Sequence, residues 1–254
     1  MTDFSYWIGV DHREPEATIV AEQSAKAMAS APFPIHHLEH LALRQANWFD
    51  RPWRIGEDGF FYDERDGKPF STQFAHTRFL TPLLAKDAGY EGWALFTDAD
   101  VLWLADPLEI LTGLDPSKTV YAVPHNYNTN TKIKMDGQQQ TNYNRKLWSA
   151  VMLWNLQSSR LPTVEMVNQA DGGYLHRFGW LDDSDIGYLS EAWQWIPNES
   201  PTTPLALQDE AENIPTPINL VHMTLGIPTM PDRRATGFDT MWSDVLKDFY
   251  RRAY

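Results

Sequence analysis

The segment Gly92–Leu104 reads GWALFTDADVLWL, and it guides the interpretation of the whole chain. The apolar run 94–97 ends at Asp98, and a second apolar run follows Asp100. The first run predicts a buried strand, and residues 101–104 are expected to continue extended or to turn. Side chains two residues apart in extended backbone point to the same side, so both carboxylates should lie together. Because unpaired carboxylates are costly beside a core, a cation is expected to compensate them.

A divalent cation fits this pair because Mg²⁺ and Mn²⁺ prefer oxygen ligands and can fill their remaining positions with phosphate oxygens. The alternative is that Asp98 caps a turn while Asp100 lies in solvent. The chain has no cysteine, which excludes disulfides, thiolate metal sites and a cysteine nucleophile. Carboxylates and histidines therefore remain as the candidate metal ligands.

Strand and helix patterns alternate on both sides of this segment. Further strands are predicted at 5–10, 32–38, 119–123, 150–154 and 218–221, and helices at 17–29, 72–84 and 107–111. Residues 47–70 have no clear period and predict an irregular excursion. The alternation favours an α/β fold with a mainly parallel central sheet flanked by helices. Ligands bind beyond the carboxyl ends of such strands, where the polar residues that follow them are expected to converge, namely Asp11, Asp98, Asn155 and His222.

Composition limits the classes of protein and partner. A chain of 254 residues that is 43% apolar can form one domain, so we expect a single domain over 1–254. The formal net charge of -13 has the wrong sign for binding a long nucleic acid. No apolar run approaches the ~18 to 20 residues of a transmembrane segment. The N-terminus carries Asp3 and no basic region before an apolar stretch, so we expect a cytoplasmic protein.

The same segment, residues 92–104, resembles the D-x-D segment of GT-A glycosyltransferases, especially the family 8 group with glycogenin and bacterial lipopolysaccharide galactosyltransferases. The resemblance implies that Asp98 and Asp100 hold Mn²⁺ or Mg²⁺ and act in catalysis, and that the partner is a nucleotide-diphosphate sugar donor. Residues 221–228, VHMTLGIP, are similar to a C-terminal motif whose histidine is the third metal ligand, which implies this role for His222.

Other segments extend the resemblance. Residues 8–11, IGVD, match a strand and loop that cradle the nucleobase and ribose; 74–82 resemble a helix whose arginine braces the donor; and 148–155 resemble a strand lining the donor sugar. The implied donor contacts are Gly9, Val10, Asp11, Arg13, Arg78, Thr97, Ala99, Ser149 and Gly226. Residues 183–185, DSD, resemble the D-Q-D segment of the family, with serine in place of glutamine, which implies that Asp183 and Asp185 are catalytic.

The implied reaction is sugar transfer to a glycan, a lipid-linked or another hydroxyl acceptor, with retention. Residues 1–105 would bind the nucleotide and residues 106–254 the sugar and acceptor. The polar segments 134–137 and 142–146 could form an acceptor-side lid or a surface loop.

Three other functions compete with this interpretation. A metal-dependent phosphohydrolase could use the same two aspartates. A carbohydrate-binding protein could use some of the 11 tryptophans as platforms. A sugar-phosphate nucleotidyltransferase would ordinarily have a glycine-rich loop after the first strand, where residues 9–13 contain one glycine.

Overall fold

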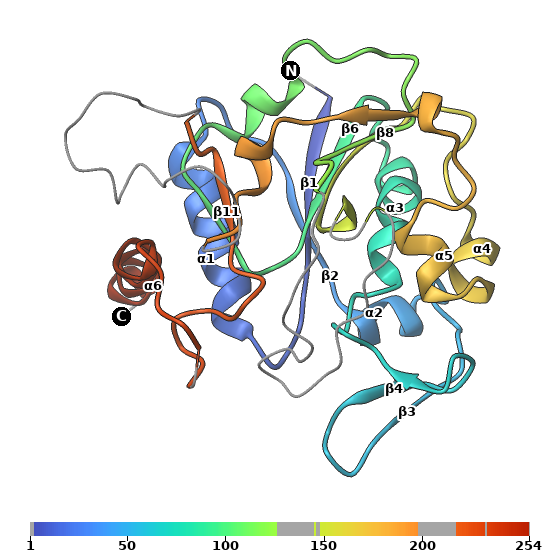
Figure 1. Cartoon of the computed structure of the whole chain (residues 1–254), viewed down its shortest axis with the longest axis horizontal. Helices are drawn as coiled ribbons and strands as arrows, with labels where there is room; N and C mark the ends of the chain where they lie inside the picture. Colours follow the sequence, from blue (N-terminus) through green and yellow to red (C-terminus); the bar gives the residue numbers. More distant parts are fainter. Residues whose placement is uncertain (1–2, 126–144, 146–147, 198–216, 232, 254) are drawn as a thin grey trace.

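The centre of the computed structural model is a six-stranded sheet, and the structure describes residues 3–125, 145, 148–197, 217–231 and 233–253 (Figure 1). The strand order is β10-β8-β9-β6-β1-β2. The strands are β1 (Phe4–Gly9), β2 (Ile35–Leu38), β6 (Trp93–Thr97), β8 (Val120–Ala122), β9 (Val151–Asn155) and β10 (Ile186–Tyr188). The pairs β1–β2, β1–β6 and β8–β10 are parallel, while β9 is antiparallel to β6 and β8.

Helices cover both faces of this sheet (Figure 1). One face carries α1 (Pro15–Met28) and, outside it, α6 (Asp239–Ala253). The other carries α2 (His40–Gln45), η1 (Thr77–Leu80), α3 (Thr81–Asp87), α4 (Val164–Gln169) and α5 (Gly172–His176). Short helical turns complete the described elements: η2 (Pro107–Leu111), η3 (Trp148–Ala150), η4 (Asp183–Asp185) and η5 (Glu191–Gln194).

The core lies in two layers because the strands alternate their side chains between the two faces. In β1, Tyr6 and Ile8 pack with α1 in one hydrophobic cluster, whereas Trp7 packs in the other. All three side chains are at most 6% exposed. A strand covered by helices on both faces reads as a continuous apolar run, which is why the sequence predicted it.

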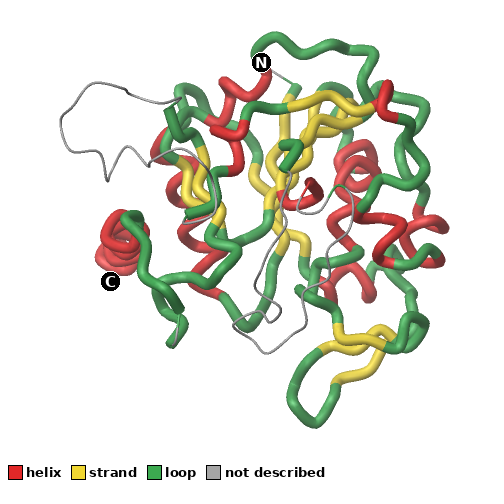
Figure 2. Tube along the Cα trace, in the orientation of Figure 1, coloured by secondary structure: helices red, strands yellow, loops and turns green. Residues whose placement is uncertain are grey.

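Two smaller sheets lie outside the central one (Figure 2). β7 (Val101–Trp103) pairs antiparallel with β11 (Leu220–His222). β3 (Trp53–Ile55), β4 (Phe61–Asp63) and β5 (Lys68–Pro69) form an antiparallel three-stranded sheet. The prediction that 47–70 is irregular was therefore wrong: its strands are too short to show a period, and Gly59 turns the β3–β4 connection with a φ of 78°.

The expected α/β fold with a mainly parallel sheet and flanking helices is confirmed, with two local differences. The helix predicted at 72–84 is divided into η1 and α3, because Pro82 stands in the first turn of α3 and starts a new helix. The second difference is the direction of β9. Its last residue, Asn155, lies opposite the first residue of β6, and its side chain donates to the carbonyls of Pro116 and Lys118. Asn155 therefore lies at the far edge and does not join the other polar residues.

Candidate metal and nucleotide site

Asp98 and Asp100 follow β6 at the carboxyl edge of the sheet. The backbone N–H of Asp98 still donates to the carbonyl of Ala150, at 3.0 Å. The chain then bends, and the N–H of Val101 donates to the carbonyl of Ala99, at 2.9 Å. Ala99 points into the core and is 3% exposed. The two carboxylates thus share one side because of a tight bend around a buried alanine, and not because the backbone is extended as expected.

His222 reaches these carboxylates through the pairing of β11 with β7. In that register His222 lies opposite Val101, and the next N–H, that of Met223, donates to the carbonyl of Asp100 at 2.8 Å. Its Nε2 is 3.3 Å from Oδ1 of Asp100 and 3.9 Å from Oδ2 of Asp98. Potential ligand atoms of the three side chains lie within 4.8 Å of one another. Neighbouring ligands of an octahedral ion with bonds of ~2.1 Å are roughly 3 Å apart, so small adjustments would seat a divalent cation here.

The charge of the site also favours a cation. Burial disfavours the charged imidazolium of His222, yet the negative charge and hydrogen bond of Asp100, helped by Asp98, raise its pKa above the usual value. Because a metal ion binds the unprotonated ring nitrogen, protons compete with the metal for this imidazole, and the metal affinity should increase with pH. The Nδ1 atom lies 3.3 Å from the amide nitrogen of the buried Gln194, which orients the ring from behind.

Arg78 holds Asp98 from the interior. Its side chain is 4% exposed, and its Nη1 is 2.8 Å from Oδ1 of Asp98. The same nitrogen donates to the carbonyl of Ser149, and the Ser149 hydroxyl lies 2.6 Å from Nδ1 of His176. Arg78 therefore lies behind the metal-binding carboxylates and is not among the residues lining the adjacent pocket.

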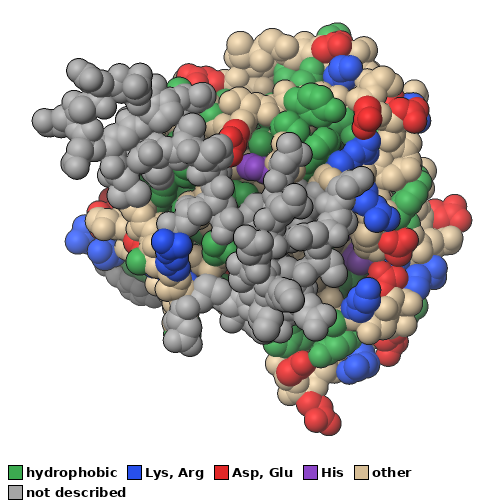
Figure 3. Space-filling view, viewed as in Figure 1, with side chains coloured by type: hydrophobic (Ala, Val, Ile, Leu, Met, Phe, Trp, Pro, Cys, Tyr) green, Lys and Arg blue, Asp and Glu red, His purple; other side chains and the backbone are tan. Residues whose placement is uncertain are grey.

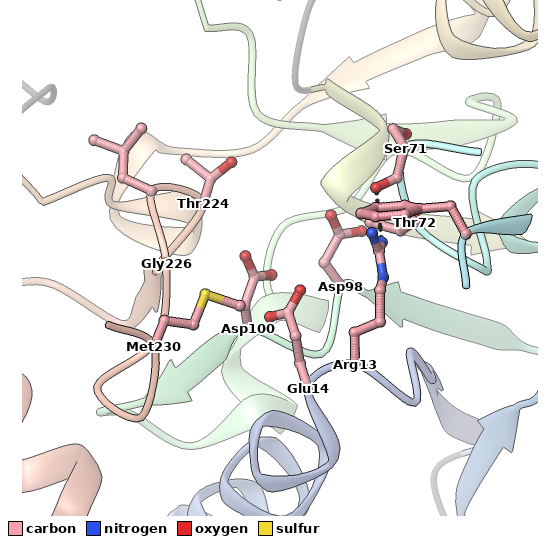
Figure 4. Close-up of a pocket in the computed structure, with 11 residues that line it drawn as sticks. Arg13, Glu14, Ser71, Thr72, Asp98, Asp100, Thr224, Gly226 and Met230 are labelled. Carbon is pink, nitrogen blue, oxygen red and sulfur yellow. Dashed lines mark hydrogen bonds between the residues drawn. The ribbon is translucent and has the colours of Figure 1, made fainter. Parts of the chain in front are cut away.

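A pocket of about 150 Å³ opens in front of the two aspartates, as Figure 4 shows. Arg13 and Gly226, both among the predicted donor contacts, line it together with Asp98 and Asp100. Sequence reasoning missed the other lining residues, which are Glu14, Phe60, Ser71, Thr72, Thr224, Leu225 and Met230. Glu14 and Thr224 stand one and two residues from Arg13 and His222, so proximity to predicted contacts was the available signal.

Glu14 occupies the pocket wall where Asp11 was expected. Asp11 is 1% exposed and accepts hydrogen bonds from the guanidinium of Arg13 and the N–H of Gln73. Burial opposes its negative charge, but these bonds outweigh it and lower its pKa. The pKa of Glu14 is raised to about 8, first by burial and then by the charge of Asp100. Asp11 thus positions Arg13, and Glu14 presents its carboxyl group to the pocket (Figure 4).

Several other predicted donor contacts are buried behind the pocket. Thr97 is inaccessible, and its hydroxyl bonds with that of Tyr6 at 2.6 Å. At Gly9, an added Cβ would lie 2.5 Å from the ring of Phe74, so close packing accounts for the glycine. The structure does not bring the following predicted residues to the lining of this pocket: Gly9, Val10, Asp11, Thr97, Ala99 and Ser149.

Asp183 and Asp185 lie at the opposite edge of the sheet, so the structure does not support their expected place beside Asp98. They precede β10, which runs parallel to β8, and the carbonyl of Asp185 accepts from the N–H of Thr119 at the start of β8. Asp183 pairs with Arg145, and Asp185 pairs with Arg160 at 2.7 Å. These aspartates stabilise a surface turn. The expected lid segment 134–137 lies outside the described residues, as do all of 142–146 except Arg145.

Acidic and basic side chains are interspersed on the visible face around α4 and α5 (Figure 3). No helix within the described ranges is long and apolar enough to cross a bilayer.

Comparison with known proteins identifies solved structures that share this fold. No family model matches the chain. The structure is similar to that of the galactosyltransferase LgtC in complex with donor and acceptor sugar analogues, at 17% identity and a TM-score of 0.55, covering 96% of this chain and 95% of LgtC. It is also similar to the glycosyltransferase GlyE of Streptococcus pneumoniae TIGR4, at 13% identity and a TM-score of 0.52, covering 98% of this chain and 64% of GlyE. These similarities establish the GT-A fold.

A curated relative is much closer in sequence. Protein CDI of Arabidopsis thaliana is 32% identical over 97% of this chain and 87% of its own length. The chain therefore belongs to the family of Protein CDI and has a GT-A fold.

Proposed function

We propose that the chain is a metal-dependent glycosyltransferase, related to family 8, that moves a sugar from a nucleotide-diphosphate sugar to an acceptor hydroxyl. One observation carries the proposal: Asp98, Asp100 and His222 present their ligand atoms within 4.8 Å of one another beside a pocket at the carboxyl edge of a GT-A sheet. Ligands of open α/β sheets bind at this edge.

Each residue of the site has a defined part in this proposal. Asp98, Asp100 and His222 would hold Mn²⁺ or Mg²⁺. When bound, such an ion would neutralise part of the negative charge that develops on the departing diphosphate. Arg78 keeps the Asp98 carboxylate in place from the interior. Arg13, whose guanidinium lies 4.8 Å from the ring of Phe60, offers a positive charge at the pocket wall.

The two halves of the chain share this work. The segment 1–105 would supply most of the nucleotide contacts, while 106–254 would supply sugar and acceptor contacts. His222 and Gly226 are contributions of the second half to the donor end. Gly226 has a φ of 114°, a conformation that favours glycine and lets the backbone come close to a ligand.

Retention of the anomeric configuration is the proposed stereochemical course. Inversion requires a general base near the acceptor hydroxyl. Three acids that could serve as such a base, Asp182, Asp183 and Asp185, pair with Arg145 and Arg160 at the far edge of the sheet. NMR assignment of the linkage in the product tests this, and an inverted product would refute retention.

Calorimetry with UDP and GDP, with and without Mn²⁺, tests the donor site. We expect one of the nucleotides to bind in a manner that depends on the metal, and we expect turnover of the matching nucleotide sugar. Asp100→Asn should weaken the metal-dependent binding and lower turnover roughly 100- to 1,000-fold, whereas the matched variant Asp248→Asn, on the exposed face of α6, should behave as the wild type. Binding of neither nucleotide, binding that is the same with and without Mn²⁺, or equal activity of the two variants would contradict the proposal.

The same preparation separates the competing functions. A phosphohydrolase would cleave phosphate esters as readily as nucleotide sugars. A carbohydrate-binding protein would bind glycans and be unaffected by a chelator, since no ion takes part.

A further inference from the structure

A second and larger cavity, of about 630 Å³, lies beside the metal site. Ser71 lines both cavities, and the link from Asp98 through Arg78 and Ser149 ends at His176, in the wall of the second. Its lining includes Asp63, Asp66, Lys68, Phe70, His76, Asp171 and Arg177. These come from β4, β5, the turn before η1, and the start and end of α5.

His76 is the feature of this cavity that points to a ligand. It is 5% exposed, and neither ring nitrogen has a hydrogen-bond partner among the described residues. The nearest acid, Asp63, has its Oδ2 3.8 Å from Nε2, which is too far for a hydrogen bond. Burial first, and the charge of Arg51 second, lower the pKa of His76 to about 3, so the ring is neutral at pH 7. A neutral imidazole offers one donor and one acceptor, and leaving both unpaired when buried is costly.

The charges around His76 decide which class of ligand fits. Asp63, Asp66 and His76 have a spacing that could hold a metal ion. However, the buried guanidinium of Arg51 already donates to both carboxylates, at 2.6 Å to each. The lining contains the carboxylates of Asp63, Asp66 and Asp171 and two cations, Lys68 and Arg177. The buried Arg51, which pairs with Asp63 and Asp66, is the third cation, so the formal charges cancel. Such a balance favours neither a metal ion nor a strongly anionic group, and it suits an uncharged ligand rich in hydroxyls.

Size and shape narrow the class further. The volume of about 630 Å³ lies within the ~300 to 1,000 Å³ typical of small-molecule sites and holds roughly twenty waters at ~30 Å³ each. This volume is larger than the volume that one hexose displaces. Phe70 and Pro69 supply apolar surface, and the carboxylates and cations around them can bond sugar hydroxyls from several directions.

We propose that this cavity is the acceptor subsite, that the acceptor is an uncharged glycan of more than one sugar unit, and that His76 offers it a hydrogen bond. This inference rests on the proposed transferase function, because only that function makes the bound glycan an acceptor. Transfer would form a bond from a glycan hydroxyl oxygen to the anomeric carbon while the bond from that carbon to the diphosphate breaks, and the hydroxyl proton would pass to an oxygen of the departing diphosphate.

A glycan array that contains neutral, phosphorylated, sialylated and uronic acid glycans tests the class directly with the labelled full chain. We expect binding to neutral glycans of two or more units, weakened about tenfold or more by His76→Leu, which removes the hydrogen-bonding ring. Lys68→Ala, on an exposed residue, should weaken binding without any effect on folding. His37→Leu is the matched control, because it removes an exposed imidazole outside the cavity.

The possible outcomes separate this inference from the proposed function. Binding only to acidic glycans, no glycan binding, or a second Mn²⁺ site in calorimetry that His76→Leu removes would each overturn the acceptor assignment. Metal-dependent nucleotide binding, measured by calorimetry, should persist in His76→Leu, because His76 does not line the pocket beside Asp98 and Asp100. If glycans bind as expected but nucleotide binding fails in the wild type, the transferase function is lost and the cavity remains a glycan site.

Discussion

Replacing Asp100 by asparagine removes one negative charge from the cation site and keeps the shape of the side chain. Asp100 suits this test better than Asp98, because Asp98 compensates the buried guanidinium of Arg78 at 2.8 Å. Asp100 is partly accessible, with its side chain 19% exposed, and its Oδ1 lies 3.3 Å from Nε2 of His222. The substitution should therefore change the chemistry of the site while the free energy of unfolding changes by less than about 1 kcal/mol.

The expected magnitude follows from the part that Asp100 plays. Removing one group that stabilises developing charge commonly costs about 2.7 to 4 kcal/mol, or roughly 100- to 1,000-fold in kcat. The pKa of His222 should fall at the same time. Burial lowers this pKa, and the charge and hydrogen bond of Asp100 are the leading causes that raise it, so burial gains weight once Asp100 is neutral.

Three measurements check this prediction. Turnover of the nucleotide sugar at saturating Mn²⁺ gives the loss in kcat, thermal denaturation gives stability, and NMR titration of the imidazole without metal gives the pKa of His222. Asp248→Asn controls for the loss of an acidic charge, since Asp248 is exposed and pairs with Arg251 at 3.1 Å. Full metal-dependent turnover in Asp100→Asn, or a His222 pKa that rises, would refute the reasoning.

Further predictions concern stability. Arg78→Met leaves the carboxylate of Asp98 without its buried partner and should cost about 3 to 5 kcal/mol in urea denaturation; a loss below 1 kcal/mol would show that the pair is not structural. Arg51→Met should have a similar cost, because two aspartates lose one guanidinium, and an unchanged melting temperature would contradict this. His40 and His76 have pKa values lowered by burial to about 4 and about 3. In the unfolded chain these two histidines bind protons as the pH falls below about 6.5, whereas in the folded chain they stay neutral at that pH. The free energy of unfolding should therefore fall from pH 6.5 toward pH 4, by up to about 1.4 kcal/mol per pH unit for each histidine. His76→Leu should flatten this dependence, and an identical slope in the variant would refute it.

Much of the fold was predictable because its signals are local. The apolar runs of β1 and β6 predict buried strands, since both faces of the sheet are covered by helices. The short strands of the β3–β5 sheet gave no such signal, and neither did the direction of β9. Whether neighbouring strands run parallel or antiparallel depends on the path of the chain between them, and no periodicity within a strand encodes it.

The site divides in the same way. By itself the sequence determined that Asp98 and Asp100 follow a buried strand and that carboxylates and histidines are the candidate ligands, because residue order and composition are sufficient for both statements. Only the tertiary structure decided that His222 faces Asp100, that Glu14 and not Asp11 lines the pocket, and that Asp183 and Asp185 lie at the opposite edge. The physical reason is that contacts between segments far apart in the sequence decide whether a polar side chain pairs with another residue or faces a ligand. These contacts form only when the strands of the sheet have paired in their final register.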